Sequence, residues 1–463
     1  MHPGSRHAAI GKPQSVDLAP LPITLPDVEE RAAMPGGFRA GGLAAGIKPS
    51  GRPDLGVIAT TGESAAVAAV FTRNQVVAAP IRLSRAHLNA TEASGGGKFG
   101  WADAIVATAG SANAATGEEG DTDQAEVGKA LAALLHTQAE RTLALSTGMI
   151  GVRLPVSKVK EGLGRLVPTL AATDEGLRAV AAAMMTTDTK IKLATTSVKM
   201  PGPDSEPVKV TVSGIAKGVG MIHPRMATML SVILTDASVP PATLHALLAP
   251  IVQRTWNQIS VDGDTSTNDT VFLLASGASK ASVAPVSHEA IMLGKAIEAV
   301  ARSLARQQAA DGEGASTLIT CQVSGAADDH DARAIARSVV SSSLLKAAVH
   351  GRDPNWGRVA SAAGNARLPE EQLLEAAGLH PTEAALRAGG APELDLDRLR
   401  IAIAGTLVFD GAPLPFARDA VRKAMEAPEV LIRLHLALGS GIGEAFGCDL
   451  TENYVIVNAE YTT

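Results

Sequence analysis

The sequence predicts a large mixed α/β protein, because helix-like and strand-like segments are interleaved along it and small residues are abundant. Of its 463 residues, 46% are hydrophobic and 19% are charged, which is enough apolar material for a buried core. Glycine contributes 45 residues and aromatic residues only 3%, a balance that favours close packing of helices on sheets. The length fits two or three folding units, or one large α/β unit.

Helices are predicted where apolar residues recur at helical spacing, in residues 125–136, 175–185 and 288–308. Short runs rich in β-branched residues predict strands. These runs are residues 208–212, 229–234, 271–275, 317–323, 400–409, 431–438 and 454–457. The first 33 residues carry scattered prolines and charges and are predicted to form a flexible tail.

Several classes of protein are excluded by composition. The net charge is -6, and neither a basic run nor a set of stacking aromatics is present for a nucleic acid. Cys321 and Cys448 are too far apart in the sequence for a zinc motif and are predicted to be buried thiols of a reducing compartment. No signal sequence and no apolar stretch of about 18 residues occurs, so we expect a cytoplasmic protein. The glycines at 439–443 resemble a dinucleotide loop, but only 20 residues follow them, too few for that fold.

The segment most informative about function runs from Lys217 to Leu230, with the sequence KGVGMIHPRMATML. Its glycine-rich first half predicts an irregular loop, and its second half enters the predicted strand 229–234. Ala227 and Thr228 therefore stand at a loop-to-strand junction. A threonine hydroxyl held beside its own preceding carbonyl can attack it and form an ester, which water then cleaves.

The threonine freed by such a cut combines two catalytic groups. Thr228 would carry a hydroxyl as nucleophile and an α-amine whose pKa, near ~8, suits a base at neutral pH. No separate His-Asp pair is then required. On the segment alone, however, Thr228 also fits a purely structural residue at the start of a strand.

This segment resembles the self-processing site of the ornithine acetyltransferase family, also called glutamate N-acetyltransferase. The family motif Lys-Gly-x-Gly-Met-Ile-x-Pro-x-Met-Ala-Thr-Met-Leu is met at every fixed position. The similarity extends from Gly36 to Thr463 through further motifs in the family's order. These are NAATG at 113–117, STGMIG at 146–151, MTTDT at 185–189, VDGDTSTNDT at 261–270, DPNWGR at 353–358 and NAEY at 458–461.

The resemblance implies a fold and a reaction. The fold is a layered α/β sandwich with sheets packed between helices, resembling N-terminal-nucleophile enzymes. Cleavage between Ala227 and Thr228 would give an α chain ending at 227, ordered from residue 34, and a β chain 228–463, assembled as an α2β2 heterotetramer. The acetylated Thr228 would pass acetyl from N-acetylornithine to glutamate by a ping-pong mechanism in arginine biosynthesis. No metal or organic cofactor is implied, and use of acetyl-CoA as a second donor stays open.

The same resemblance assigns site residues. The Thr147 hydroxyl and the Gly148 backbone N–H would stabilise the oxyanion of the tetrahedral intermediate. A lysine suits the substrate carboxylate and a glutamate suits the ornithine ammonium. The residues implied to bind substrate are Thr186, Lys217, Thr228, Glu313, Asn458 and Thr463. Spacing alone would instead make Lys217 an exposed charge and Glu313 a turn acid, and only the motif match favours Thr186 over Thr187.

Other candidate residues receive structural interpretations. Residues 262–269 superficially resemble a calcium loop, but Thr267 and Leu273 stand where that loop needs glycine and glutamate, so a polar loop near the site is expected. His223 lies close to the cut, although a threonine amine needs no such helper. Trp356 is expected to be a packing anchor.

Departures from the family pattern leave the acceptor less defined than the nucleophile. Thr462 stands where an arginine often precedes the terminal threonine, TAGS at 108–111 replaces an asparagine-led motif, and the loop 200–207 is longer than usual. Two alternatives therefore remain open. One is a related self-processing amidase or aminopeptidase, and the other is an uncleaved, inactive homologue.

Overall fold

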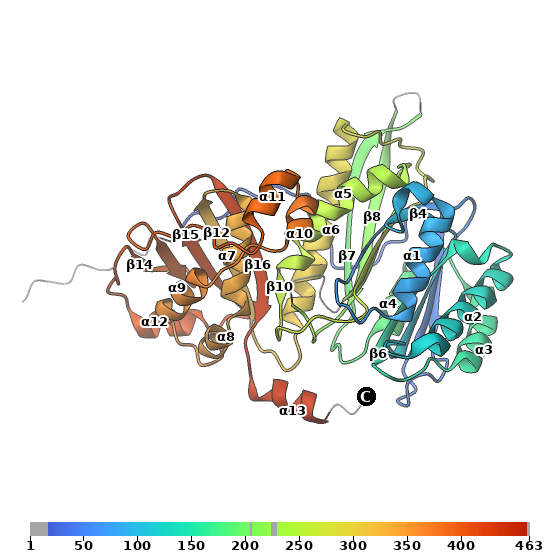
Figure 1. Ribbon diagram of the computed structural model, residues 1–463, viewed down its shortest axis with the longest axis horizontal. Helices are drawn as coiled ribbons and strands as arrows, with labels where there is room; N and C mark the ends of the chain where they lie inside the picture. Colours follow the sequence, from blue (N-terminus) through green and yellow to red (C-terminus); the bar gives the residue numbers. More distant parts are fainter. Residues whose placement is uncertain (1–16, 204–205, 224–228, 461–463) are drawn as a thin grey trace, which may run out of the picture.

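The computed structural model describes residues 17–203, 206–223 and 229–460, and these form two lobes that lie side by side (Figure 1). The first lobe contains the elements from β1 to α6, except for the short strand β10, and the second lobe contains the elements that follow. Ala227, Thr228 and Thr463, all predicted to belong to the active site, lie outside the described residues.

Two sheets form the centre of the first lobe. The four-stranded sheet has the order β1 (Phe38–Leu43), β2 (Leu55–Thr60), β5 (Ala104–Ser111) and β6 (Thr142–Met149). The six-stranded sheet has the order β4 (Phe99–Ala102), β3 (Ala65–Phe71), β11 (Thr270–Ala275), β9 (Leu230–Thr235), β8 (Pro207–Lys217) and β7 (Lys192–Pro201). Neighbouring strands are antiparallel except for the parallel pairs β5–β6 and β9–β11.

Helices lie between these two sheets and cover their outer faces. Helices α1 (Ala79–Thr91) and α4 (Asp174–Met184) lie between the sheets, α2 (Gly117–Leu135) and α3 (Val156–Leu166) cover the four-stranded sheet, and α5 (Pro241–Arg254) and α6 (His288–Ala310) cover the six-stranded one. Strand β3 shows why helices can pack on both faces of the six-stranded sheet. Its Val67 packs toward α4 while Ala66 and Ala68 pack toward α5 and α6, because successive side chains of a strand face opposite sides. The predicted layered α/β sandwich is confirmed.

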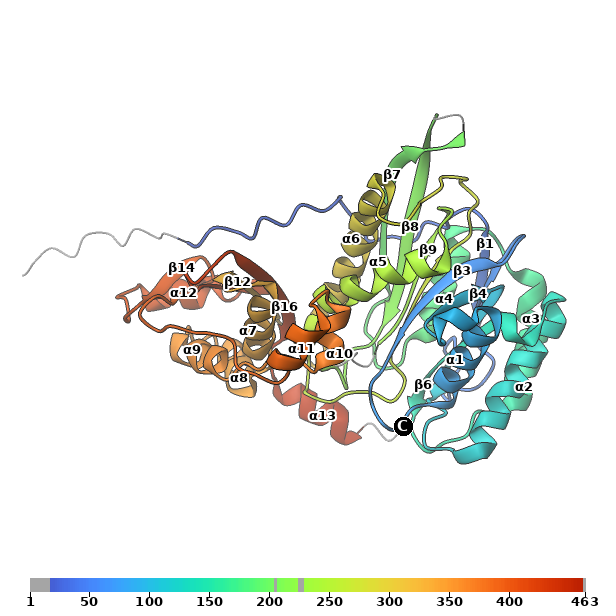
Figure 2. The same ribbon diagram turned by 45° about the horizontal axis from the view of Figure 1, so that its top comes forward.

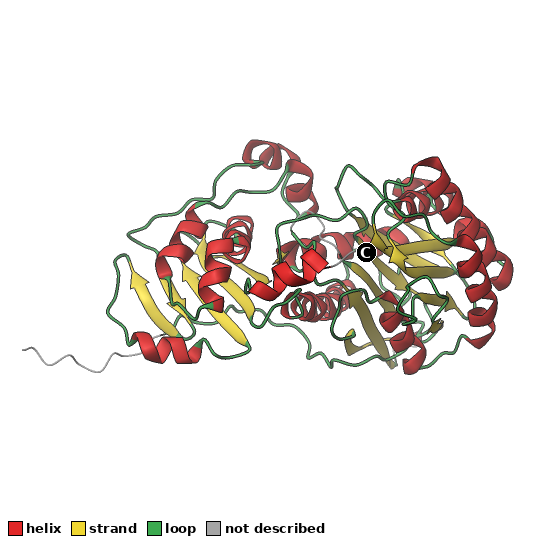
Figure 3. Cartoon of the chain, turned by 90° about the horizontal axis from the view of Figure 1, so that it is seen from below, coloured by secondary structure: helices red, strands yellow, loops and turns green. Residues whose placement is uncertain are grey.

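The second lobe is built on a single six-stranded sheet. Its order is β10 (Ile259–Ser260), β16 (Gly441–Cys448), β12 (Leu318–Ala326), β15 (Glu429–His435), β13 (Arg400–Ile403) and β14 (Thr406–Asp410). The helices of this lobe are α7 (Asp329–Ser341), α8 (Ser343–His350), α9 (Trp356–Gly364), α10 (Glu371–Ala376), α11 (Pro381–Arg387), α12 (Arg418–Ala424) and α13 (Glu452–Glu460). Burial alternates along β15, so one face of the sheet packs on the apolar sides of α7 and α9. Figure 3 shows the helices flanking the strands in both lobes.

Most elements predicted from periodicity are confirmed. The helices expected at 125–136, 175–185 and 288–308 correspond to α2, α4 and α6. The strand expected at 400–409 is a hairpin, because Ala404 and Gly405 adopt positive φ values of 47° and 80° and turn the chain between β13 and β14. Gly441 begins strand β16 and not a helix, which agrees with the rejection of a dinucleotide loop.

The strand predicted at residues 454–457 is wrong, because this segment lies within helix α13. Tyr454, Val455 and Ile456 favour a strand by composition, but β propensity expresses the fit of side chains to a half-buried sheet. No residue of α13 is buried. The segment therefore has no sheet face to occupy, and it folds by local helical hydrogen bonds below the rest of the molecule (Figure 1).

Residues 17–33 run from the second lobe to the first (Figure 2). Arg433 on β15 pairs with Asp17 and donates to the Leu18 carbonyl oxygen at 2.9 Å. Glu29 forms an antiparallel bridge with Thr195 on β7. This part of the predicted tail thus contacts one sheet in each lobe. The division of the chain into α and β parts stays a prediction.

Candidate active site

A cavity of about 280 Å³ is formed where the ends of several elements meet. It is lined by residues of the β6 turn, the loop after α4, the end of β8, the polar loop before β11, the segment after α6, and α13. The lining includes Ala112, Thr147, Gly148, Ile150, Thr186, Thr187, Lys217, Gly220, Met221, Ser266, Thr267, Asn268, Glu313 and Asn458. Six residues that the motifs predicted as site residues therefore share one cavity.

Thr147 and Gly148 lie at the end of β6, beside the parallel strand β5. Gly148 has a φ of 127°, and a Cβ there would lie 2.4 Å from the carbonyl carbon of Gly110. The close approach of the two strands therefore requires glycine at this position. The Thr147 hydroxyl accepts a hydrogen bond from Lys217 Nζ at 3.1 Å, so the predicted oxyanion residue and the predicted carboxylate ligand touch.

Lys217 is the last residue of β8 and is only 4% exposed. The prediction from spacing that Lys217 is an exposed charge is wrong, because the end of β8 places this buried side chain in the wall of the cavity. Burial lowers the pKa of the Lys217 ammonium, and the charge of Asp188 opposes this shift. Gln308 fixes the backbone at this point by donating to the Lys217 carbonyl oxygen at 2.8 Å.

Asp188 joins two of the segments that line the cavity. Its carboxylate accepts the backbone N–H of Thr186 at 3.0 Å and that of Gly218 at 2.8 Å. Lys192 Nζ bonds the same carboxylate at 2.7 Å and Asp311 at 2.7 Å. Although burial favours the neutral acid, Lys217 and Lys192 lower the pKa of Asp188 to about 2. Sequence reasoning missed this pair, although Asp188 belongs to the MTTDT motif.

Glu313 is held above the cavity by two side chains. Thr187 Oγ1 donates to one carboxylate oxygen at 2.7 Å, and Asn458 Nδ2 donates to the other at 3.0 Å. The Glu313 backbone N–H also donates to the Val219 carbonyl oxygen at 2.8 Å. Thr187 therefore makes the direct hydrogen bond to Glu313, whereas both Thr186 and Thr187 line the cavity. The choice between them as substrate contacts stays a prediction.

The polar loop before β11 supports the β6 turn. Asn268 Nδ2 donates to the carbonyl oxygens of Ala112 at 2.7 Å and Ser146 at 2.8 Å, which fixes the backbone next to Thr147. Asp262 accepts the backbone N–H of Ile222 at 2.9 Å, so its carboxylate binds backbone. Within the ranges that the structure describes, no group of His, Cys, Asp or Glu side chains has the arrangement of a metal site.

Strand register shows where the chain enters the site after residue 228. Leu230, the first residue of β9, pairs with Lys217 on one side and with Thr270 on the other. The Met229 backbone N–H donates to Asp269 Oδ1 at 2.9 Å. The residue that follows Thr228 is thus held between the strand that ends in Lys217 and the loop that lines the cavity.

Four other residues considered from the sequence do not line the cavity. Trp356 stacks on Phe409 with ring centroids 4.9 Å apart, which confirms it as a packing residue. Cys321 and Cys448 are buried free thiols, as predicted. His223 Nδ1 lies 3.1 Å from Ser260 Oγ and does not line the cavity.

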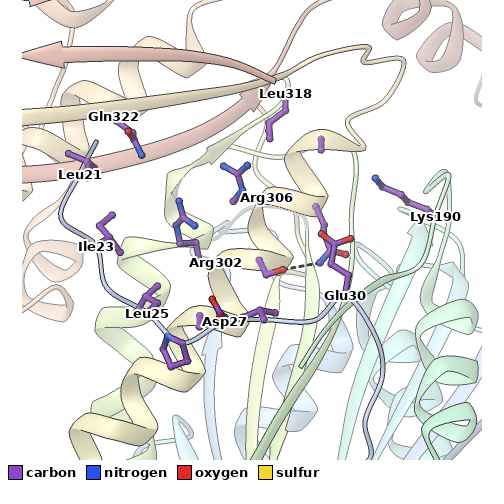
Figure 4. A pocket seen from close by; sticks show the side chains of 16 residues that line it. Leu21, Ile23, Leu25, Asp27, Glu30, Lys190, Arg302, Arg306, Leu318 and Gln322 are labelled. Carbon is purple, nitrogen blue, oxygen red and sulfur yellow. Dashed lines mark hydrogen bonds between the residues drawn. The ribbon is translucent and has the colours of Figure 1, made fainter. Parts of the chain in front are cut away.

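A second cavity, of about 480 Å³, lies between α6 and the segment 21–30. Figure 4 shows Arg302 and Arg306 projecting from α6 into this space. Arg302 pairs with Glu444, and Arg306 Nη2 lies 2.8 Å from Glu429 Oε2. Because carboxylates already neutralise both guanidinium groups, this cavity offers less binding chemistry than the one around Lys217.

Comparison with known proteins identifies the family of this chain. The model of a family described as the ArgJ family matches residues 39–463. The chain belongs to the ArgJ family. It is 43% identical over 430 residues to the arginine biosynthesis bifunctional protein ArgJ of Thermus thermophilus, covering 93% of this chain and 99% of the relative. It is 42% identical to the Synechocystis protein of the same name, covering 94% and 98%. The family resemblance drawn from the motifs is confirmed, and the chain is an enzyme of this family.

Solved structures from the ArgJ family also match. One is the arginine biosynthesis bifunctional protein ArgJ of Bacillus halodurans, at 36% identity and a TM-score of 0.43, covering 50% of this chain and 98% of that chain. Another is an ornithine acetyltransferase from Mycobacterium tuberculosis, complexed with ornithine, at 33% identity and a TM-score of 0.37. The match covers 44% of this chain and 99% of that chain. Among the described residues, no helix has the length and apolar character needed to cross a membrane.

Proposed function

We propose that the chain cuts itself between Ala227 and Thr228 and then transfers acetyl from N-acetylornithine to glutamate through Thr228. The observation that carries this proposal is the register of β9. Its first residue, Leu230, pairs with Lys217, and Lys217 contacts Thr147, so the strand that follows the proposed cut begins beside two residues that line the cavity. The curated relatives are named arginine biosynthesis bifunctional proteins, which supports the same reaction.

The first half-reaction uses one residue as nucleophile and base. The Thr228 hydroxyl oxygen attacks the acetyl carbonyl carbon while its proton passes to the Thr228 α-amine. The oxyanion then forms beside the Thr147 hydroxyl and the Gly148 N–H, which are fixed before the reaction begins. Collapse breaks the amide bond, the α-ammonium gives its proton to the departing nitrogen, and ornithine leaves.

The second half-reaction regenerates the enzyme. The α-amino nitrogen of glutamate attacks the acetyl ester of Thr228 and loses a proton to the Thr228 α-amine. Collapse breaks the ester bond and returns the proton to the threonine oxygen, which releases N-acetylglutamate. One step that forms the acetyl ester and one step that breaks it thereby replace a direct exchange between amides.

The charges of the cavity suit amino-acid substrates. Lys217 supplies a buried cation for the substrate carboxylate, and Glu313 supplies a carboxylate for the side-chain ammonium of ornithine. Thr186, Asn458 and Thr463 complete the proposed set of substrate contacts. A volume of about 280 Å³ fits a small substrate of this kind.

The two chains would stay together after the cut. Strand β8 precedes the cut and β9 follows it, and they pair along residues 212–217 and 230–235 of one sheet. On the other side, β3 of the α chain pairs with β11 of the β chain. Separation would break both ladders, so an αβ unit is the expected product, assembled further into the α2β2 form.

Product analysis tests the proposed reaction. The purified enzyme is incubated with acetyl-labelled N-acetylornithine, with and without glutamate. We expect labelled N-acetylglutamate only when glutamate is present, and we expect Thr228→Ala to abolish it. Labelled acetate at the same rate in both samples would identify a hydrolase. Addition of acetyl-CoA in place of N-acetylornithine tests the second donor.

A further inference from the structure

Lys192 is a buried cation that the mechanism above does not use. It is the first residue of β7, and its side chain is 0% exposed. Its Nζ lies 2.7 Å from Asp188 Oδ1 and 2.7 Å from Asp311 Oδ2, and it also donates to the Lys190 carbonyl oxygen at 3.3 Å. The two carboxylates are themselves 0% and 5% exposed. These three charged groups form a buried ion cluster, in which one cation holds two anions together.

The first acid of the ion cluster supports the cationic end of the cavity. Asp188 Oδ1 accepts the backbone N–H of Gly218, the residue after Lys217, at 2.8 Å. Asp188 Oδ2 accepts the backbone N–H of Thr186 at 3.0 Å. Lys217 and Thr186 both line the cavity, and the charge of Asp188 acts directly on Lys217. The end of the cavity that suits a substrate carboxylate is therefore fixed by Asp188.

The second acid supports the anionic end. Asp311 is the C-cap residue of α6, and only Gly312 separates it from Glu313, which lines the cavity. Its carboxylate accepts the backbone N–H of Thr189 at 3.1 Å and also the Thr189 hydroxyl. A displacement of Asp311 would therefore carry the backbone of Glu313 with it. The end of the cavity that suits a substrate ammonium depends on where Asp311 is held.

We propose that Lys192 is a specificity-determining positioning residue, which holds Asp188 and Asp311 together and thereby sets the separation between the two charged ends of the cavity. The ligand selected in this way is an α-N-acyl diamino acid of one chain length. The inference rests on the proposed function, because it requires a donor with a carboxylate for Lys217 and an ammonium for Glu313.

The burial of the ion cluster explains why a charged link was needed. A buried ion pair contributes little net stability compared with apolar residues of similar size, so stability alone does not account for it. Removal of one member leaves an uncompensated buried charge, so the cluster has only one favourable arrangement. Neutral contacts also join the two ends, since the Glu313 N–H donates to the Val219 carbonyl oxygen at 2.8 Å. The ion cluster adds to them a link that solvent does not screen.

The test measures selectivity for chain length. The donors are N-acetylornithine and the α-N-acetyl derivatives of 2,4-diaminobutyrate and lysine, which are one methylene shorter and longer. The full-length unaltered enzyme is compared with Asp311→Asn and Lys192→Arg, with glutamate as acceptor. The matched control is Glu444→Gln, because the Glu444 carboxylate is 6% exposed and pairs with Arg302 of α6, outside the cavity. The ratio of kcat/KM between two donors does not depend on the fraction of active protein.

The unaltered enzyme should prefer N-acetylornithine over both other donors by at least about tenfold, the usual effect of one methylene in a fixed pocket. Asp311→Asn should lower the preference over N-acetyllysine by at least about threefold, because its single amide oxygen cannot replace a carboxylate and the Glu313 end can move outward. Lys192→Arg keeps a cation between the acids, but its larger guanidinium should separate them and change the preference in the same direction. Glu444→Gln should keep the preference of the unaltered enzyme.

Two results would overturn the inference. One is a donor preference that stays within about twofold of the unaltered value in a folded variant of the ion cluster, even where all three donors react more slowly. The other is an equal kcat/KM for all three donors in the unaltered enzyme, a measurement that needs no variant to fold. Absence of transfer from N-acetylornithine by the unaltered enzyme would instead overturn the proposed function, so the two failures are distinguishable.

Discussion

Gly220 leaves the space that the carboxylate of Glu313 occupies. A Cβ at Gly220 would lie 2.2 Å from Glu313 Oε2, closer than any unstrained contact allows. This relationship explains in physical terms why the Lys-Gly-x-Gly motif ends in glycine. The second glycine of the motif, three residues after the cationic Lys217, shapes the anionic side of the cavity.

Gly220→Ala should therefore weaken substrate binding. The methyl group displaces the Glu313 carboxylate and breaks its hydrogen bonds to Thr187 and Asn458. We expect KM for N-acetylornithine to rise at least about tenfold, which corresponds to the loss of one charge-assisted contact. Steady-state kinetics check this, with Gly164→Ala as control because a Cβ at Gly164 meets open space. An unchanged KM would show that Glu313 does not hold the substrate ammonium.

Lys217→Met should remove the cation that lines the cavity while keeping most of the buried side-chain volume. We expect kcat/KM for N-acetylornithine to fall about a hundredfold, because both the substrate carboxylate and the Thr147 hydroxyl lose a charged donor. Lys160→Met is a matched control, since the Lys160 side chain is half exposed and its Nζ lies 3.8 Å from Glu126 Oε2, outside the cavity. Equal losses in both variants would contradict a specific role for Lys217.

Thr147→Ala should lower kcat with little change in KM. The hydroxyl is proposed to act on the oxyanion, which exists only in the intermediate and in the transition states around it. Loss of one such donor typically lowers the rate by about 10²–10³. Single-turnover acetylation of Thr228 measures this step directly. A raised KM with an unchanged kcat would instead make Thr147 a ground-state substrate contact.

Stability at low pH should depend on Asp188. Its pKa is lowered from 3.8 to about 2, so the folded state holds the ionised form more strongly than the unfolded state does. A depressed acid stabilises the fold above pH ~4, and this contribution, on the order of 2 kcal/mol, is lost as the pH falls toward 2. Urea unfolding of Asp188→Asn at pH 6 and pH 3 checks the sign. The unaltered enzyme should lose more stability between these pH values than the variant, and equal losses would contradict the assignment.

The sequence predicted the layers of the fold but not the contacts that build the site. The helices α2, α4 and α6 follow from apolar periodicity, because each has one face buried on a sheet. The helix at Tyr454 could not be predicted from its β-branched residues, since the decisive fact is the absence of a buried face there. Local composition contains no information about such tertiary surroundings.

The site itself was predicted by motif and not by spacing. Lys217 and Glu313 come from segments 96 residues apart, and only the pairing of β8 with β9 and the end of α6 bring them to one cavity. The support provided by Asp188 and Lys192 depends on their joint burial, which no local pattern indicates.

The intact mass of the purified protein tests the central claim most directly. We predict two chains, one ending at Ala227 and one beginning at Thr228. After incubation with N-acetylornithine and no acceptor, the β chain alone should gain one acetyl group, located on its first residue by fragmentation. A single uncut species of 47.2 kDa, or an acetyl group on any other residue, would contradict the account.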